Sequence, residues 1–192
     1  MLDQALRFVL DVVFGLFTYA FLLRFLMQWQ RAPFRNPLSQ AVVALTDWAV
    51  KPIRRVLPGF RGIDWSTLLL AYLAQFFWLL ATGVVVGTIV WSANVVAVVA
   101  LLAVVELLKT TIWLLVIVVI VQAVLSWVAP DGPLAGLLNA LTFRFLAPIR
   151  RVVPPVGGAL DLSPLILIVI LQLILMLPVR WLESAIVAAF RG

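Results

Sequence analysis

The sequence contains neither cysteine nor histidine. Without these side chains the chain has no disulfide bond, no thiol nucleophile and no imidazole base for a hydrolase triad. It also has no cysteine or histidine ligand for zinc or haem iron. We therefore expect no catalytic residue, no metal site and no cofactor, and we expect that the protein is not an enzyme.

Charged residues are also scarce. Only 11% of the 192 residues are charged, 65% are apolar, and the mean hydropathy is +1.19. Soluble domains average about 25% charged and about 45–50% apolar residues. A water-soluble fold of this length could not bury so much apolar surface, so the composition predicts a protein that lies in lipid.

The apolar residues gather in four segments, each long enough to cross a hydrocarbon core of about 30 Å as a helix. They cover roughly residues 8–29, 67–90, 110–128 and 164–187. The first continues without a small-residue cleavage site, so we expect an uncleaved anchor rather than a signal peptide.

A shorter apolar segment, residues 94–108, precedes the third span. It is short for a membrane span, and we interpret it as an interfacial or partly sunk helix that leads into the third span. Glu106 and Lys109 are expected to pair on one face of this helix. The alternative is a fifth span, which would place the two basic loops of the chain on opposite sides of the membrane.

The sequence repeats itself. The matching positions include prolines, arginines and other polar residues, which shared hydrophobicity does not explain. At an offset of 96 residues, Pro37, Thr46, Pro52, Ile53, Arg54, Arg55 and Pro58 match Pro133, Thr142, Pro148, Ile149, Arg150, Arg151 and Pro154. At an offset of 97, Asp64, Ser66 and Gln75 match Asp161, Ser163 and Gln172, and at 98 Trp29 matches Trp127.

These observations predict an all-α membrane protein with two tandem repeats and about four transmembrane helices. Each repeat consists of a transmembrane helix, an interfacial amphipathic helix bent at proline, and a second transmembrane helix. The first repeat covers residues 1–92, an interfacial linker helix covers 93–109, and the second repeat covers 110–192. An even number of spans separates the copies, so we expect parallel repeats related by an axis along the membrane normal.

Two basic links, residues 36–58 and 132–154, join the paired spans. At ~100° per residue, the apolar and polar side chains of the first link fall on opposite sides, which is typical of an interfacial helix. Proline removes an amide donor and crowds the preceding turn, so we expect the first helix to end near Val50, before a short basic turn. Structural bends are predicted at Pro52, Pro58, Pro148 and Pro154.

The arginine pairs of the links and the aspartates that follow them are the candidate partner- or lipid-binding residues. The arginines would present guanidinium groups to lipid headgroups or to a docking partner, or would only set the topology. Each aspartate would pair with an arginine of its own repeat, or take part in a cap of the next helix. These residues are Arg54, Arg55, Arg150, Arg151, Asp64 and Asp161.

Three polar side chains lie inside the predicted spans. Gln75 and Gln172 are predicted to form hydrogen bonds across helix–helix contacts rather than to bind a substrate. Arg24 lies near the end of the first span, and we expect its side chain to extend toward the membrane interface.

The basic residues also predict orientation and partners. Lysine and arginine are more frequent on the links than on the opposite side, which places both links in the cytoplasm and both termini outside the inner membrane. The net charge of +6 is carried next to apolar spans, so we expect anionic lipid headgroups, a membrane-protein partner or a second copy, and no nucleic acid.

The strings KPIRRVLP and APIRRVVP, with Gly-Ile-Asp at 62–64 and Asp-Leu-Ser-Pro at 161–164, carry a resemblance. The chain resembles the YggT family of small bacterial membrane proteins, called YlmG in plastids and Gram-positive bacteria. The resemblance implies a connection with osmotic or cation stress tolerance, with cell division, and in plastids with nucleoid distribution and haem-protein maturation. Where family members often carry a second arginine, this chain has Gln122, so a role of Arg24 need not be duplicated.

We therefore predict a non-enzymatic membrane protein that organises membrane partners or assists their assembly through its basic links. The alternative function is that of an ion or small-solute transporter, or a channel subunit. Parallel repeats suit transporters, but the spans carry few buried ionisable residues, which transport sites usually need.

Overall fold

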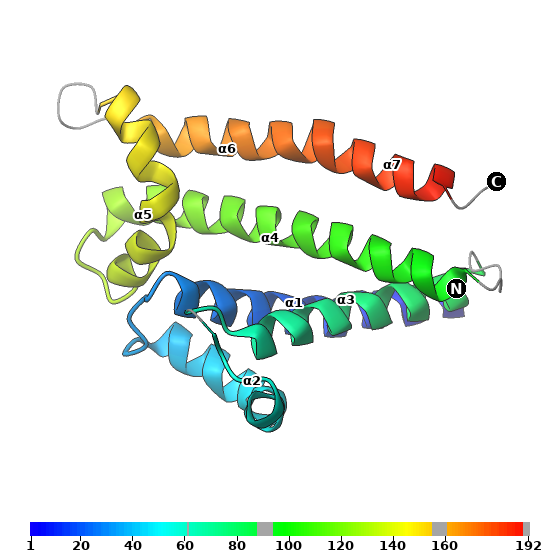
Figure 1. Ribbon diagram of the computed structural model, residues 1–192. Coiled ribbons are helices and arrows are strands. Elements are labelled where there is room, and N and C mark those ends of the chain that lie inside the picture. The colour runs from blue at the N-terminus through cyan, green and yellow to red at the C-terminus, as the bar shows by residue number, and fades with distance from the viewer. Residues whose placement is uncertain (61, 88–93, 155–160, 190–192) are drawn as a thin grey trace.

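The computed structural model describes residues 1–60, 62–87, 94–154 and 161–189, and most of this part of the chain is helical (Figure 1). The elements are α1 (Leu2–Trp29), α2 (Pro37–Val56), α3 (Trp65–Val86), α4 (Val95–Val128), α5 (Ala135–Val152), α6 (Ser163–Ile174), the π-helical segment η1 (Leu175–Val179) and α7 (Arg180–Ala189). Four helical stretches are long and apolar enough to cross a membrane: α1, α3, α4 and the continuous stretch Ser163–Ala189. The predicted all-helical class with four spans is confirmed.

The helix ends follow from local sequence. Asn36 caps α2 by accepting a hydrogen bond from the Ser39 amide at 2.9 Å, and Pro37 occupies the first turn, where its missing amide costs nothing. At the other end of the first repeat, α3 stops at Gly87, whose φ of 70° is the left-handed conformation that glycine adopts without a steric penalty. These caps fix where the link helix begins and where the second span ends.

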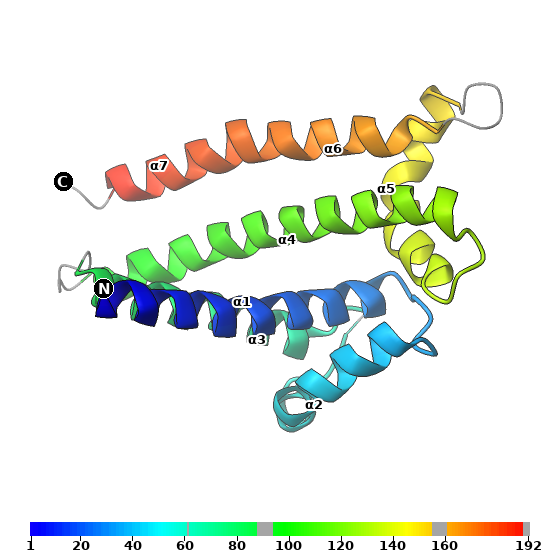
Figure 2. The ribbon, with the colours of Figure 1, turned by 180° about the vertical axis from the view of Figure 1, so that it is seen from behind.

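The two repeats follow each other as α1–α2–α3 and α4–α5–α6–η1–α7. Helices α1 and α4 run in the same direction, so the repeats are parallel (Figures 1 and 2). The start of α1 and the end of α7 lie at one end of the bundle, and α5 crosses the other end. Contacts between α1 and α5 join the repeats: the Arg144 guanidinium lies 5.5 Å from the Trp29 ring centre, and Gln30 reaches the Leu141 carbonyl.

The segment 94–108 is not a separate interfacial helix, and it is not a fifth span. It is the first half of α4, which continues unbroken for 34 residues. No glycine or proline interrupts the sequence between Val95 and Val128, so the helix has no reason to stop there. At ~1.5 Å per residue α4 is about 50 Å long, well above the thickness of a hydrocarbon core. The expected pairing of Glu106 with Lys109 is confirmed, at 2.6 Å.

The prediction that the first link helix ends near Val50 is also wrong. The helix continues through Pro52 to Val56, and α5 continues through Pro148 to Val152. A proline removes one backbone hydrogen bond, and the last turns are still closed by the bonds from Leu57 and Val153 to carbonyls four residues earlier. Both helices change direction along their length, so each proline-containing helix bends without ending (Figures 1 and 2).

The absence of cysteine makes the orientation easy to test. Val56 and Val152 are matching exposed positions at the ends of the two link helices, and Leu2 is exposed at the opposite end of the bundle. We expect Val56→Cys and Val152→Cys to react with a membrane-impermeant maleimide in inverted vesicles, and Leu2→Cys to react in intact cells. Labelling of the two valine positions from opposite sides of the membrane would contradict the arrangement of the repeats.

Candidate functional site

The first basic link is fastened to the start of α3 by Asp64. This buried carboxylate, 7% exposed, forms an ion pair with Arg54 and also accepts a hydrogen bond from the Ser66 amide at 3.2 Å. The ion pair and the cap were alternatives in the sequence, and the structure contains both. Asp64 itself is the capping residue of α3, while the Ser66 hydroxyl donates to the Leu57 carbonyl at the end of the link.

The second basic link repeats this arrangement. Arg150 contacts one Asp161 oxygen through Nε at 2.9 Å and Nη2 at 2.7 Å, and the other oxygen accepts from the Ser163 amide at 2.9 Å. Burial raises the pKa of Asp161, but the Ser163 and Arg150 hydrogen bonds outweigh it and leave this pKa below its ordinary value. The carboxylate therefore stays ionised, and the ion pair intact, at neutral pH.

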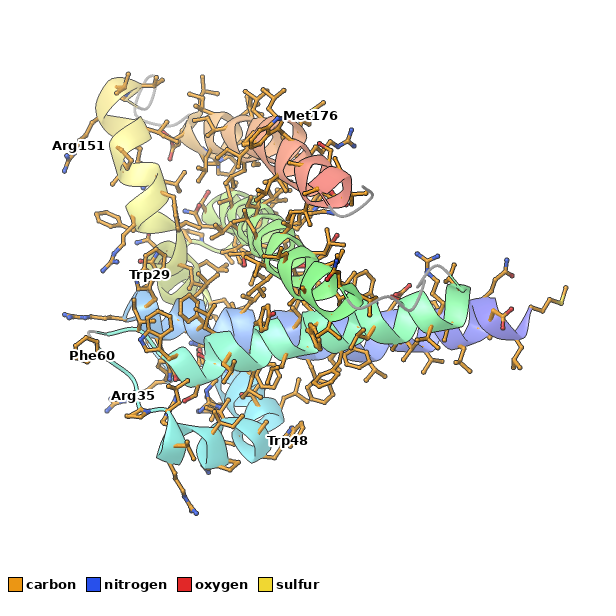
Figure 3. All side chains as sticks on the ribbon, turned by 45° about the vertical axis from the view of Figure 1, so that its right-hand side comes forward. Trp29, Arg35, Trp48, Phe60, Arg151 and Met176 are labelled. Atoms are coloured by element: carbon orange, nitrogen blue, oxygen red, sulfur yellow. The ribbon has the colours of Figure 1, made fainter. Side chains whose placement is uncertain are left out.

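The second arginine of each pair is placed differently. Arg55 and Arg151 are exposed, and within the described part of the chain neither forms an ion pair. Figure 3 shows Arg151 pointing away from the bundle. Their neighbours Val56 and Val152 are 86% and 81% exposed. Each link therefore ends in one arginine fixed by an aspartate and one free arginine beside an exposed apolar side chain.

Arg24 does not extend to the interface as predicted. Its side chain is buried, 4% exposed, and it donates to the Thr46 hydroxyl at 2.7 Å and to the Asp47 carboxylate at 2.9 Å. Asp47 is also paired with Lys51 at 2.7 Å. The Lys51 hydrogen bond lowers the pKa of Asp47, burial raises it, and Arg24 adds to the lowering, so the net shift is downward. Arg24 therefore joins α1 to α2 through Thr46 and Asp47, and we call this contact the arginine clamp.

Sequence reasoning missed Thr46 and Asp47 as partners of Arg24. The sequence held two signals. Thr46 has a matching threonine, Thr142, in the second repeat, and Asp47 is an isolated acid on the polar face of the link, one turn before Lys51. A cation at the edge of a span usually finds water, so the burial of Arg24 has no local sequence signal.

Two glutamines were predicted to join helices, and the structure confirms one of them. The Gln75 amide donates to the Thr110 hydroxyl at 2.7 Å and links α3 to α4. Gln172 is half-buried in α6 and has no side-chain hydrogen bond to the described residues, so its expected role stays a prediction.

Two polar contacts between the span helices were not predicted from the sequence. The Trp78 indole donates to Asp11 at 2.7 Å, between α3 and α1. Lys109 of α4 contacts Glu183 of α7 at 3.3 Å in addition to Glu106. The side chains of Asp11, Glu106, Lys109 and Glu183 are 22% to 44% exposed, so they do not contradict the expectation that the spans carry few buried ionisable residues.

Comparison with known proteins agrees with the repeat. The family model described as CCB3/YggT matches this chain twice, at residues 4–85 and at 101–182. The chain belongs to the CCB3/YggT family. The second match begins at residue 101, within the first half of α4, so this part of the helix belongs with the second repeat.

Curated relatives share most of the chain. The "Uncharacterized protein YggT" of Escherichia coli K12 is 38% identical over 174 residues, which cover 89% of this chain and 87% of the relative. The "Uncharacterized protein PA0392" of Pseudomonas aeruginosa is 38% identical over 194 residues, 95% of this chain and 92% of its own. The "Uncharacterized protein in proC 3'region" of Vibrio alginolyticus is 34% identical over 172 residues, covering 88% and 90%. No solved structure matches.

Within this CCB3/YggT chain the two repeats are not equivalent. The positions of Arg24, Asp47 and Lys51 correspond to Gln122, Phe143 and Ala147 in the second repeat. The arginine clamp is therefore present once, which agrees with the expectation that the role of Arg24 is not duplicated. The Gln122 carbonyl oxygen is buried and has no partner among the described residues.

Proposed function

We propose that this multi-pass protein is not an enzyme, and that it organises membrane partners or assists their assembly by binding anionic groups at its two basic links. The observation that supports the proposal is the free arginine of each link, Arg55 and Arg151, held next to an arginine that is already fixed by an aspartate. A purely topological signal needs cations on one side of the membrane and does not need this repeated geometry.

The ion pairs orient the free arginines. Because Asp64 and Asp161 hold Arg54 and Arg150, the last turn of each link helix is fixed against the following span. The adjacent guanidinium group then projects from a rigid base, so less backbone freedom is lost on binding. An anionic lipid headgroup or an acidic segment of a membrane protein has the matching charge, and the exposed Val56 and Val152 suit the edge of the hydrocarbon region.

The orientation belongs to the same proposal. We place both links on the cytoplasmic side of the inner membrane and both termini outside, from the excess of lysine and arginine on the links. Osmotic or cation stress tolerance and cell division are the processes in which we propose that this organising role acts.

The proposal is tested by crosslinking in native membranes. A photoreactive amino acid at position 56 or 152 lies next to the free arginine of its link. We expect both positions to yield the same adduct, and we expect Arg55→Ala with Arg151→Ala to reduce its yield at least about tenfold, since a charged contact is worth more than 1.4 kcal/mol when desolvated.

The matched control is Arg31→Ala with Arg35→Ala. It removes two exposed arginines from the same end of the bundle and leaves both arginine pairs intact. The adduct should persist in this control. Equal loss in both double variants would mean that overall charge, rather than the fixed arginine geometry, attracts the partner, and would contradict the proposal. Transport by reconstituted protein that is unaffected by Arg55→Ala with Arg151→Ala would favour the transporter alternative.

A further inference from the structure

A cavity of about 560 Å³ lies between α4 and α6, at the end of the second repeat where these spans meet the link. Its volume is within the range of about 300–1,000 Å³ that small-molecule sites have. Apolar side chains form most of the wall, and polar groups are contributed by the end of α4 and by the link. The lining includes Ile120, Val124 and Trp127 of α4, Arg150 of α5, and Leu165 and Ile168 of α6.

The matching positions of the first repeat are packed instead of open. Val124 is 54% exposed, whereas its match Leu26 is 2% exposed, and Ile168 matches Ala71, which is fully buried. Helix α3 packs closely on α1, while a wider space separates α6 from α4 (Figures 1 and 2), and the cavity lies in this space. The same structural unit is therefore closed in one repeat and open in the other.

Two differences in sequence account for the open space. Small residues let membrane helices approach closely, and isoleucine at 168 replaces the alanine at 71. In the first repeat the ring of Phe25 also lies 6.4 Å from the ring of Trp29. The matching pair in the second repeat is Ala123 and Trp127, so no second ring fills this space. The cavity therefore follows from the residues of the second repeat and not from the fold that both repeats share.

The depth of the cavity indicates what can occupy it. Its lining on α4 extends from Ile120 to Trp127, which is about 10 Å at ~1.5 Å per residue. The hydrocarbon core of a bilayer is about 30 Å thick, so the cavity lies within one leaflet, on the side of the links. A transmembrane helix of a partner would cross both leaflets, whereas an acyl chain occupies only one. The depth therefore favours a lipid.

The outer end of the cavity offers hydrogen-bond donors. Arg150 and Asp161 neutralise each other, and both Asp161 oxygens already accept, from Arg150 and from the Ser163 amide. In the described part of the chain, the indole N–H of Trp127 and Nη1 of Arg150 have no acceptor. An arginine has five N–H donors, and its aspartate does not use them all. A molecule with uncharged or charged oxygen acceptors at one end and an apolar chain behind them matches this arrangement.

We propose that the cavity binds one phospholipid of the leaflet on the link side. An acyl chain lies between α4 and α6, and the ester and phosphate oxygens accept from Trp127 and Arg150. Because the lining carries no net charge, zwitterionic and anionic headgroups are expected to bind alike. The site does not use the free arginines Arg55 and Arg151, so it goes beyond the function proposed above.

Native mass spectrometry of the purified full-length chain in detergent tests the proposal. The probes are palmitoyl-oleoyl-phosphatidylethanolamine and palmitoyl-oleoyl-phosphatidylglycerol, each added in increasing amounts. We expect a single tightly bound phospholipid per chain with either probe. Binding of many phospholipids with equal affinity would mean unspecific lipid contact and would overturn the proposal.

The decisive variant is Ala123→Phe, which places a ring beside Trp127 as Phe25 lies beside Trp29. It should fold, because the first repeat has this pair of side chains. By filling the cavity it is expected to weaken binding of the tight phospholipid at least about tenfold, a loss of 1.4 kcal/mol or more. Trp127→Phe removes the indole donor and is expected to weaken binding by roughly three- to tenfold, as the loss of one hydrogen bond does.

The matched control is Val121→Phe. Val121 is exposed, lies two residues from Ala123 on the opposite side of α4, and is outside the cavity lining. This variant should bind the phospholipid as the wild type does. Unchanged binding by Ala123→Phe would overturn the proposal, and so would an equal loss in Val121→Phe.

A photoreactive amino acid at Val124 identifies the occupant in native membranes without any change to the cavity mouth. We expect an adduct with the mass of a phospholipid. An adduct with a protein would show that a partner helix fills the space and would overturn the proposal. Arg55→Ala with Arg151→Ala should leave the bound phospholipid in place, because neither arginine lines the cavity, and this result separates the present proposal from the function of the free arginines.

Discussion

Replacing Arg24 with glutamine is expected to lower the free energy of unfolding by about 2–3 kcal/mol. The change removes the hydrogen bonds to Thr46 and Asp47, and it leaves the half-buried Asp47 carboxylate without its buried partner. The loss falls below the range for a fully buried ion pair because Lys51 still contacts Asp47. Unfolding of the purified protein by sodium dodecyl sulfate in mixed micelles, followed by circular dichroism, measures it.

The second repeat supplies the compensating change. Gln122 and Phe143 occupy the positions of Arg24 and Asp47 there, so a glutamine and an aromatic residue are compatible with this helix contact. Arg24→Gln combined with Asp47→Phe is expected to regain at least half of the stability lost by Arg24→Gln alone, because the half-buried carboxylate is gone and the only charge that loses a partner is the exposed Lys51. Arg35→Gln, at an exposed position, should change stability by less than about 0.5 kcal/mol. Additive losses in the double variant would contradict the clamp.

The membrane spans and the repeat could be predicted because both are carried by many residues. Composition alone excluded a water-soluble fold, and matches of proline and arginine between the repeats are too specific to arise from shared hydrophobicity. The boundary before the third span was predicted wrongly because the apolar segment 94–108 has no breaker that separates it from α4. Length alone suggested an interfacial helix, while the uninterrupted helix-forming sequence favoured continuity.

Proline position was a weaker guide than the apolar pattern. Ile53, one residue after Pro52, lies on the same apolar stripe as the residues before it, so the burial of that stripe continues across the bend. One lost hydrogen bond does not outweigh this packing. Both link helices therefore end four residues beyond their proline.

Contacts between distant residues were the part that the sequence could not provide. Asp11 and Trp78 are 67 residues apart and belong to no shared motif. The pairing of Arg24 with Asp47 likewise depends on how α2 folds back on α1. Local rules gave two separate roles for Asp64 and Asp161, and only the three-dimensional arrangement shows that a carboxylate with two oxygens performs both.

Replacing these two aspartates in turn is expected to show how burial changes the value of the same contact. Asp64→Ala removes a helix cap, worth about 1 kcal/mol, and a charged hydrogen bond worth about 1.5–3 kcal/mol, so we expect a loss of about 3 kcal/mol. The Asp161 side chain is 28% exposed against 7% for Asp64. Solvent screens its ion pair, and Asp161→Ala is expected to cost about half as much. Detergent-induced unfolding of the two variants measures the difference.

The asparagine variants separate the two contributions. Asparagine keeps the oxygen that accepts the Ser66 or Ser163 amide but cannot form the ion pair, so it should regain about 1 kcal/mol relative to alanine in both repeats. The hydrogen bond from the serine amide then cancels in the comparison of Asp64→Asn with Asp161→Asn, and what remains is the difference between a buried and a partly exposed arginine–aspartate pair. Equal losses would mean that exposure does not set the strength of this contact. The two links would then be interchangeable in stability, although only the first is also held by Arg24.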